Sequence, residues 1–414
     1  MIKTKSIFQP NTIYCGDNKD VLRHFEEKRV DLIYLDPPFF SNKHYEVIWN
    51  DGYELRAFED RWKGGINNYI GWMEERLIEC YKVLKDNGSI YLHCDWHAGH
   101  YLKVMMDRIF GQHNLRNEII WHYESGGRAI NFFPTKHDTI FFYSKSNDYY
   151  FDWQSVGIPR NKCQCCGEEL ESWNHMKKHI DKGGRIYRTI KSAGKVYKYY
   201  DDEPVPPTDV WNDISHIQQK DPERLGYPTQ KPEKLLHRII SASSKPTDIV
   251  LDPFCGCGTA ISVAHKLGRR WVGIDVSPTA CKLMAKRMRS IGAKGFKEIG
   301  LPQTIGDLKK IQPFEFQNWV MEKLYARVSS KKTGDMGIDG YYIDGSPIQV
   351  KQSEDIGRNV VDNFESAIRR AGKNKGVIVA FSFGKGAHEE VAKVKLEQGL
   401  EITLKTVEEI LKET

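Results

Sequence analysis

Residues 248–268, "DIVLDPFCGCGTAISVAHKLG", have the pattern of a strand, a glycine turn and a helix. An apolar run ends in Asp252, and Gly256 and Gly258 allow both a tight turn and the close approach of a ligand to the backbone. A second apolar run ends in Asp275, 23 residues later, where an acid commonly grips ribose hydroxyls. The turn is not G-x-G-x-x-G and no Gly-Lys-Ser/Thr follows, which disfavours NAD and a P-loop.

A second corner stands at residues 30–40, "VDLIYLDPPFF". Pro37 and Pro38 stop a strand and remove two backbone donors. Asp36 supplies a carboxylate, Pro37 a carbonyl that the rigid backbone keeps aimed, and Phe39 a ring on which a base can stack. Two acceptors that face one amine would draw its nitrogen toward tetrahedral geometry. The corner therefore suits an amine carried by a flat ring, and the family resemblance given below implies that this is the exocyclic amine of a nucleobase flipped out of its duplex.

Apolar runs alternate with helical patterns on both sides of these corners, which predicts an α/β fold. Residues 122–210 are polar, basic and rich in Gly, Tyr and Pro, and look inserted. We expect a catalytic part at 1–121, a target-recognition region at 122–210, a cofactor-binding part at 211–295, a linker at 296–309 and a further domain at 310–414.

The two corners together resemble the motifs of the DNA amino-methyltransferases. "IYCGDNKDVL" is similar to the adenine-side motif of that family, and "GYPTQKPEKLLHRII" to the segment before its glycine loop. The order of the motifs matches the β group, over about residues 10–290. The resemblance implies a Rossmann-like sheet, S-adenosylmethionine as cofactor and double-stranded DNA as partner. It assigns catalysis to Asp36, Pro37, Pro38 and Phe39, and cofactor binding to Asp17, Asp252, Phe254, Gly256, Gly258, Thr259 and Asp275.

The choice of base rests on the first residue of the DPPF corner. N4-cytosine members of the family often carry serine there, so Asp36 with Phe39 favours N6-adenine. Two alternatives stay open: an N4-cytosine methyltransferase, or a Mg²⁺-dependent endonuclease whose methyltransferase part serves recognition.

A cysteine cluster marks the inserted region. "CQCCGEELESWNHMKKHI" begins with Cys163-x-x-Cys166-Gly, a knuckle that suits tetrahedral zinc. Twelve residues separate Cys166 from His179, as in zinc fingers. On a helix His175 would share a face with His179. We expect zinc on Cys163, Cys166, His179 and His175, with Cys165 as a substitute; the alternative is a reduced Cys-rich turn.

Basic and tyrosine residues alternate after the cluster, in "RIYRTIKSAGKVYKYY", which predicts a hairpin. Phosphate contacts and base stacking are the functional interpretation; a solvated edge protected by lysines is the alternative. The candidate DNA-binding residues are Lys177, Lys178, Arg185, Arg188, Lys191, Lys195 and Lys198.

The last section, about 310–414, resembles the Mrr-type restriction endonuclease domain, a small α/β fold of the PD-(D/E)xK class. Asp339 opens one hairpin strand, and Gln349 and Lys351 share a face of the next. Such a set can bind Mg²⁺ and activate water on a phosphodiester. Glu315 falls in the family's first helix. Gln349 in place of an acid leaves one charge fewer for the metal, so the alternative is a DNA-binding fold without cleavage.

Bulk properties are ordinary. The net charge of the 414 residues is +6 and no apolar run approaches the length of a membrane span. The first residues lack the apolar core of a signal peptide. We therefore expect a cytoplasmic protein of a restriction–modification system, with no membrane partner, and leave a homodimer open.

Overall fold

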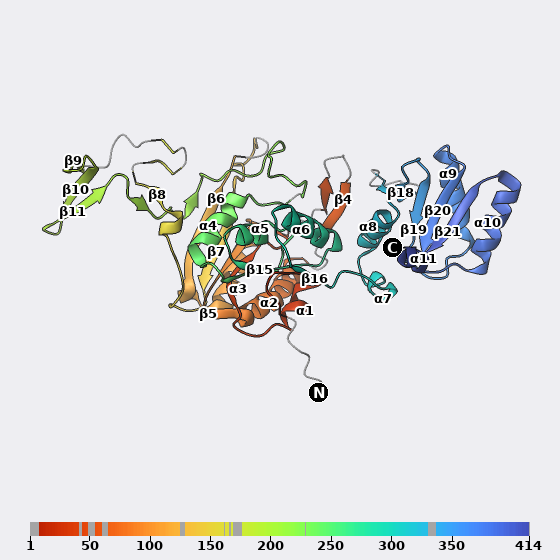
Figure 1. The fold of residues 1–414 in the computed structure, drawn as a ribbon, viewed down its shortest axis with the longest axis horizontal. Helices are drawn as coiled ribbons and strands as arrows, with labels where there is room; N and C mark the ends of the chain where they lie inside the picture. Colours follow the sequence, from red (N-terminus) through yellow and green to blue (C-terminus); the bar gives the residue numbers. More distant parts are fainter. Residues whose placement is uncertain are drawn as a thin grey trace, which may run out of the picture.

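The computed structural model describes residues 8–40, 44–48, 54–59, 65–124, 129–160, 162–164, 167–168, 176–227, 229–329 and 337–413. Figure 1 shows a central α/β body, a small β-sheet that projects from one end, and a second α/β unit at the other end. No helix in these ranges is long and apolar enough to cross a membrane.

A nine-stranded sheet forms the centre of the body. In spatial order its strands are β13 (Val210–Trp211), β6 (Leu115–His122), β7 (His137–Ser144), β5 (Leu84–Cys94), β2 (Val30–Leu35), β14 (Ile249–Asp252), β15 (Arg270–Asp275), β1 (Thr12–Cys15) and β16 (Lys297–Ile299). Only β7 runs against its neighbours. This is the expected Rossmann-like sheet.

Helices bury both faces of the sheet, which explains why its strands are apolar throughout. On β2, Leu32 and Tyr34 point into one core, and Ile33 and Leu35 into the other. The first core is covered by α4 (Glu233–Ser243), α5 (Thr259–Lys266) and α6 (Pro278–Ser290). The second is covered by α1 (Asn18–Leu22), α2 (Ile66–Val83) and α3 (Gly99–Phe110), which η1 (Gln112–Asn114) follows.

Strands β2 and β14 are neighbours although more than two hundred residues separate them. They pair in parallel, with Leu32 opposite Val250 and Ile33 opposite Leu251. Carboxyl ends of parallel strands share one edge of a sheet. The pairing therefore places Asp36 and Asp252, each at the end of its strand, side by side. On the far side of β15, Cys15 of β1 lies opposite Asp275.

The projecting unit is an arm of short strands (Figure 1). An antiparallel sheet is formed by β9 (Lys177–Ile180), β10 (Ile186–Ser192) and β11 (Lys195–Tyr200). A separate two-stranded sheet is formed by β8 (Ile158–Pro159) and β12 (Pro204–Val205). The short helix η2 (Gln154–Val156) precedes β8 in the sequence. The expected hairpin is β10–β11. Two expectations were wrong. Strand β7 belongs to the main sheet, so residues 122–210 are not one insertion, and His179 lies on β9 rather than on a helix.

The C-terminal unit has its own five-stranded mixed sheet: β17 (Arg327–Val328), β18 (Gly340–Tyr341), β19 (Pro347–Val350), β20 (Lys375–Ala380) and β21 (Glu401–Thr406). Its helices are α7 (Ile305–Leu308), α8 (Pro313–Lys323), α9 (Arg358–Arg370), α10 (Lys385–Gln398) and α11 (Val407–Glu413). It has two hydrophobic cores separate from the body. The expected linker, 296–309, contains regular structure: β16 lies within it and pairs with β1 in the main sheet. A hairpin of β3 (His44–Ile48) and β4 (Glu54–Glu59) completes the described backbone.

Candidate active site

A cavity of about 1100 Å³ opens at the carboxyl edge of the sheet. Four acids line it from four neighbouring strand ends: Asp17 after β1, Asp36 after β2, Asp252 of β14 and Asp275 of β15. The predicted cofactor and catalytic residues Pro37, Pro38, Phe39, Phe254, Gly256 and Thr259 also line it. The structure thus brings both sequence motifs into one cavity, at the edge where α/β sheets bind ligands.

The glycine loop needs its glycines for conformation and for space. Gly256 and Gly258 have φ values of 51° and 81°, in the left-handed region that favours glycine. A Cβ on Gly258 would lie 2.9 Å from Met284 Cγ, and one on Gly256 would lie 3.0 Å from the Tyr227 ring. The Gly256 amide donates to Asp275 Oδ2 at 2.8 Å. The loop is therefore fixed against the second acid before any ligand binds.

Burial shapes the protonation of the two acids beneath the loop. It raises the pKa of the Asp252 carboxyl well above its usual range, and the negative charges of Asp36 and Asp275 add to the effect. Burial also raises the pKa of Asp275, to about 6. A cationic ligand in this cavity would offset the mutual repulsion of these carboxylates.

Asp17 occupies the next strand end and is held from α2. Its Oδ2 accepts from Arg76 Nη2 at 2.5 Å, while its Oδ1 accepts from the Lys19 amide at 2.9 Å and caps α1. Arg76 is buried and stacks over Trp72, 3.8 Å from the ring centroid. Asp17 and Asp275 both line the cavity, at the ends of the paired strands β1 and β15, and the adenine-side role of Asp17 stays a prediction.

The DPPF corner is held in position by a hydrogen bond from Tyr69 and by stacking on His93. Tyr69 of α2 donates its hydroxyl to the Pro38 carbonyl at 2.8 Å. The Phe39 ring stacks on His93, with centroids 5.7 Å apart. His93 is fully buried; its Nδ1 lies 2.9 Å from the Tyr34 hydroxyl, and its Nε2 lies 3.0 Å from Asp138 Oδ2. Tyr34, His93 and Asp138 come from β2, β5 and β7, so the antiparallel strand β7 helps to set the position of the Phe39 ring.

Lys231 was not predicted, yet it directly contacts Asp36, the acid that the sequence predicts to be catalytic. Its ammonium lies 2.8 Å from Oδ1 and 2.6 Å from Oδ2 of Asp36, and 5.0 Å from the centroid of the Phe39 ring. Only 9% of Lys231 is exposed. It belongs to "TQKPE", whose resemblance to a family motif pointed to the segment without indicating which residue acts.

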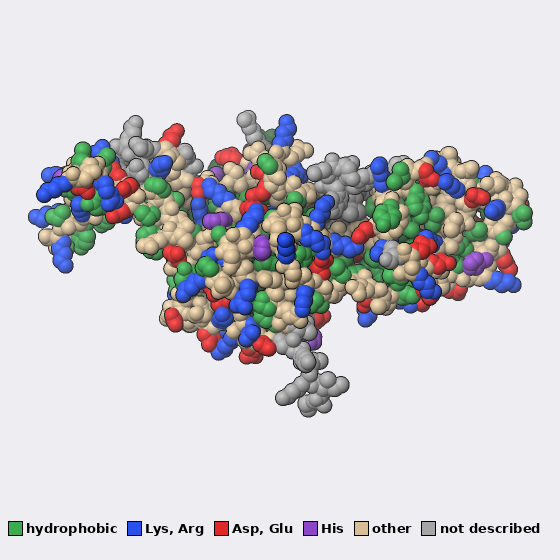
Figure 2. All heavy atoms as spheres, viewed as in Figure 1, with side chains coloured by type: hydrophobic (Ala, Val, Ile, Leu, Met, Phe, Trp, Pro, Cys, Tyr) green, Lys and Arg blue, Asp and Glu red, His purple; other side chains and the backbone are tan. Residues whose placement is uncertain are grey.

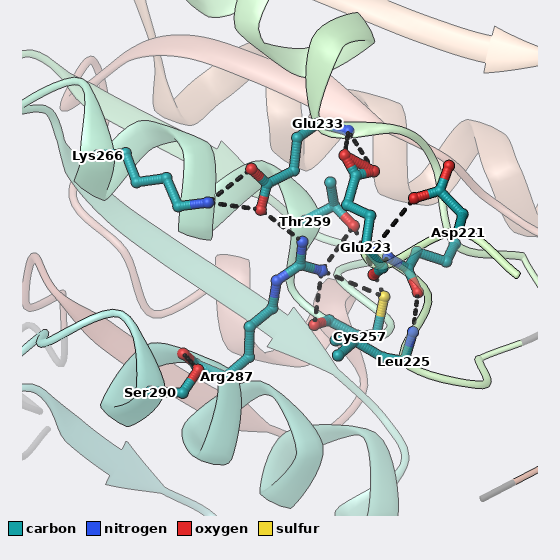
Figure 3. Close-up of polar contacts among 10 residues, drawn as sticks. Asp221, Glu223, Leu225, Glu233, Cys257, Thr259, Lys266, Arg287 and Ser290 are labelled. Atoms are coloured by element: carbon teal, nitrogen blue, oxygen red, sulfur yellow. Dashed lines mark hydrogen bonds and ion pairs between the residues drawn. The ribbon is translucent and has the colours of Figure 1, made fainter. Parts of the chain in front are cut away.

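A polar network fixes the segment that carries Lys231 (Figure 3). Glu233, the first residue of α4, accepts from Lys266 at 2.6 and 2.7 Å and from Arg287 at 3.0 Å, and its amide donates to the Glu223 carboxylate. Arg287 also donates to the Thr259 hydroxyl at 2.9 Å. The network joins α4, α5 and α6, and so ties the position of Lys231 to the cofactor loop.

The arm carries the predicted DNA-binding residues, and Figure 2 shows Lys and Arg side chains gathered there. Lys177, Lys178, Lys191 and Lys195 are exposed. Arg185 pairs with Asp202 at 2.7 Å and Arg188 with Asp201 at 3.0 Å, while Lys198 lies over the rings of Tyr187 and Tyr200. The two arginines therefore stabilise the arm itself, and the exposed lysines provide the charge at its surface.

The predicted zinc ligands are only partly in view, since Cys166 and His175 lie outside the described residues. The Gly167 amide donates to the Cys163 carbonyl at 2.9 Å, and Gly167 has a φ of 73°. His179 Nε2 instead lies 2.9 Å from the Thr189 hydroxyl, and its ring stacks on Tyr187. Within the described ranges no cluster of metal ligands is formed.

In the C-terminal unit, Asp339 and Gln349 meet across two strands. The β18–β19 register pairs Gly340 with Ile348, which puts Asp339 opposite Gln349. Asp339 Oδ2 accepts from the Val350 amide at 2.7 Å. Gln349 is buried, and its Oε1 has no hydrogen-bond partner among the described residues. Lys351 lies two residues after Gln349 and is half-buried. A carboxylate beside an unsatisfied amide oxygen is a donor pair that fits Mg²⁺.

Glu315 does not join this set. From α8 its carboxylate accepts from the hydroxyls of Ser277 and Thr279, at the start of α6, so it lies between the two units and lines the large cavity. Burial raises the pKa of Glu315 to about 7. The sequence placed this residue in the correct helix, but its position along the helix does not show which domain its side chain faces.

We expect the free energy of unfolding to fall as pH rises from about 4.5 to about 7, because the native Glu315 carboxyl holds its proton more tightly than the unfolded one. Glu315→Gln removes this titration. Above pH 7 the free energy of unfolding of the variant should therefore exceed that of the native chain by up to about 3 kcal/mol. Urea unfolding at pH 5 and pH 8 measures the difference. Glu322→Gln, on the exposed face of the same helix, is the control. A difference that is the same at both pH values would contradict the assignment.

Both parts of the chain are similar to known protein families. Residues 30–287 match a family model described as DNA methylase, and residues 308–412 match one described as restriction endonuclease. The Type II methyltransferase M.EcaI of Enterobacter cloacae is 29% identical over 331 residues, covering 69% of this chain and 71% of its own. The DNA adenine methyltransferase YhdJ of Escherichia coli (strain K12) is 28% identical over 282 residues, covering 68% and 83%.

Among solved structures, the PvuII DNA methyltransferase (cytosine-N4-specific) aligns with a TM-score of 0.46 and 16% identity, over 70% of this chain and 97% of that one. The sequence-family match is the decisive finding, because it spans more than half of the chain and includes the DPPF corner, the glycine loop and Lys231. The chain belongs to the DNA methylase family, and carries a restriction-endonuclease-like domain behind it.

Proposed function

We propose that this protein transfers a methyl group from S-adenosylmethionine to the N6 amine of adenine in DNA. The observation that carries the proposal is the shared cavity, in which the acid and carbonyl of the DPPF corner stand beside the acids of the glycine loop. Asp275 would hold the ribose, Asp17 the adenine side, and Asp252 with the loop the methionine portion of the cofactor. The sulfonium and ammonium of that cofactor would offset the crowded carboxylates.

The exocyclic amine is a poor nucleophile because its lone pair is delocalised into the base. Asp36 and the Pro37 carbonyl would each accept one of its N–H bonds, which localises the lone pair toward the methyl group. Attack forms the N–C bond as the S–C bond breaks, and the bonding pair stays on sulfur as a neutral thioether. The methylated nitrogen then releases a proton toward Asp36 and solvent. No covalent bond to the protein forms.

Adenine is favoured over cytosine by the residues of the corner and by one relative. Asp36 and Phe39 match the N6-adenine form of the motif, and the relative YhdJ is described as a DNA adenine methyltransferase. The restriction-endonuclease-like domain and the Type II methyltransferase relatives support a place in a restriction–modification system.

An exposed apolar loop supports a DNA substrate with a flipped base. Ile130 and Phe133 are 97% and 96% exposed, and they lie between β6 and β7, at the edge of the sheet where β2 ends. Apolar side chains of this kind unstack base steps when a duplex is distorted. The lysines of the arm would contact phosphates beside the target.

Asp36→Ala should lower the rate of methyl transfer at least about 10²-fold, because it removes a preorganised acceptor of the amine. The assay follows labelled methyl groups from S-adenosylmethionine into unmethylated plasmid DNA. Asp36→Asn keeps the shape of the side chain and tests that loss of charge, rather than misfolding, causes the defect. Asp86→Ala, at an exposed acid, is the control. Undiminished transfer by Asp36→Ala would refute the mechanism.

The double variant Lys191→Ala/Lys195→Ala should weaken DNA binding and lower the slope of log affinity against log salt by about 2, roughly one for each lost phosphate contact. Fluorescence anisotropy with a labelled duplex between about 50 and 200 mM salt gives the slope. Lys385→Ala/Lys412→Ala, on the C-terminal unit, is the control pair. An unchanged slope would remove the arm from the DNA interface.

We propose DNA cleavage as a second function of the C-terminal domain. The unsatisfied Gln349 Oε1 beside Asp339 favours it. Asp339 and Gln349 would hold Mg²⁺, which when bound activates water and neutralises charge on a phosphodiester. Lys351 would orient the attacking water or the phosphate. A Cys163–Cys166 zinc knuckle with the predicted histidines, a homodimer and a cytoplasmic location all stay predictions.

Unmethylated plasmid DNA incubated with the protein and Mg²⁺ should be cleaved, and Lys351→Ala should lower the cleavage rate at least about 10²-fold, as removal of a catalytic electrostatic group does. Lys385→Ala is the exposed control. Electrophoresis of the products, with and without S-adenosylmethionine, measures the rates. No cleavage by the native chain would leave the domain a DNA-binding module, and equal cleavage by Lys351→Ala would contradict the proposed role of Lys351.

A further inference from the structure

Lys231 occupies the centre of the proposed transfer site. Its ammonium donates to both oxygens of Asp36, over the face of Phe39, and the residue is buried. These are the two groups that the mechanism assigns to the target base. Whatever role Lys231 has, it must be reconciled with a substrate that uses the same partners.

We propose that Lys231 is a positioning residue that stands in for the target amine in the resting enzyme, and that entry of the flipped base displaces it. The proposal rests on the proposed function. In the empty site the ammonium satisfies and orients Asp36; in the loaded site the base amine takes over that acceptor.

Hydrogen bonding supports the exchange. The Lys231 ammonium and an exocyclic amine are both N–H donors, and a carboxylate is an acceptor only. The distances of 2.6 and 2.8 Å show that the ammonium lies between the two oxygens, within the range of strong charge-assisted bonds. The amine of a base that is stacked on Phe39 would meet the same two oxygens of Asp36.

Space supports it as well. A base stacked on Phe39 lies against the ring face, about 3.5–4 Å away, the usual separation of carbon atoms in contact. The ammonium is 5.0 Å from the ring centroid and bonded to the adjoining acid. A base amine on Asp36 and an undisplaced ammonium would therefore compete for one volume.

Charge sets the order of events. The cofactor brings a sulfonium, and the attacked nitrogen becomes cationic as the methyl group moves. An ammonium left beside Asp36 would repel both. Displacement before transfer removes this repulsion and leaves Asp36 to stabilise the new cation. Asp138 is a second acid near the ammonium: the bond from His93 lowers its pKa most, and the charge of Lys231 and the bond from Tyr123 lower it further.

The stand-in also discriminates between bases. Adenine and cytosine present an amine that can replace the ammonium on Asp36. Guanine and thymine present a carbonyl oxygen at the corresponding position, which would face the carboxylate without a hydrogen. Only a base with an amine at that position can displace Lys231 without leaving Asp36 unsatisfied, and rejection by an unpaired polar group is a strong form of specificity.

Two substitutions at Lys231 give opposite predictions for a stand-in and for a structural ion pair. Lys231→Met keeps the stem but removes the donor, so the KM for DNA should fall at least threefold while kcat changes less. Lys231→Arg binds a carboxylate through a bidentate fork and is harder to displace, so the KM should rise at least threefold. A structural ion pair predicts the reverse order, with Arg near native and Met impaired. Lys234→Met, an exposed lysine in the first turn of α4 and three residues after Lys231, is the control.

A binding experiment tests the same point without turnover. In Lys231→Ala, methylammonium should occupy the vacated position and compete with duplex DNA in fluorescence anisotropy, whereas the native chain should be insensitive to it. Tighter DNA binding or faster methyl transfer on adding methylammonium would overturn the proposal, because it would mean that a cation assists at Asp36. Absence of methyl transfer by the native chain would refute the proposed function instead, and the competition result stands apart from it.

Discussion

The parallel pairing of β2 with β14 is the constraint on which the rest of the structure depends. The register of this pairing, with Leu32 opposite Val250 and Ile33 opposite Leu251, brings Asp36 and Asp252 to one edge of the sheet. Neither residue could act alone: one end would hold a methyl donor with no acceptor, the other an amine with no methyl group. Strands β2 and β14 are far apart in the sequence but are held together because both of their faces are buried. The geometry of the site is therefore maintained by two hydrophobic cores.

Charge is the second organising feature. Seven carboxyl groups line one cavity, and burial holds the pKa of Asp252, Asp275 and Glu315 above their ordinary values. A cationic cofactor is the natural complement of such a site. Lys231 supplies a cation at Asp36, and the network around Glu233 connects the segment of Lys231 to the glycine loop.

The sequence predicted what depends on local pattern: both corners, the Rossmann-like sheet, the β10–β11 hairpin and the second domain. It missed what depends on tertiary contact. Lys231, Arg76 and His93 act through partners 195, 59 and 45 residues away, and no periodicity reveals such pairs. Glu315 was placed on the correct helix but against the wrong domain. His179 was expected on a helix because its spacing to His175 fits one, yet a strand in a three-stranded sheet took precedence.

The measurement that tests the account most directly is the modified nucleoside itself. Unmethylated duplex DNA is incubated with the native chain and S-adenosylmethionine labelled in its methyl group, digested, and analysed by mass spectrometry. The shared cavity and the DPPF corner predict labelled N6-methyladenine as the product. Labelled N4-methylcytosine would contradict the assignment of the base, and DNA without label would contradict the central claim that the two strand ends form one methyl-transfer site.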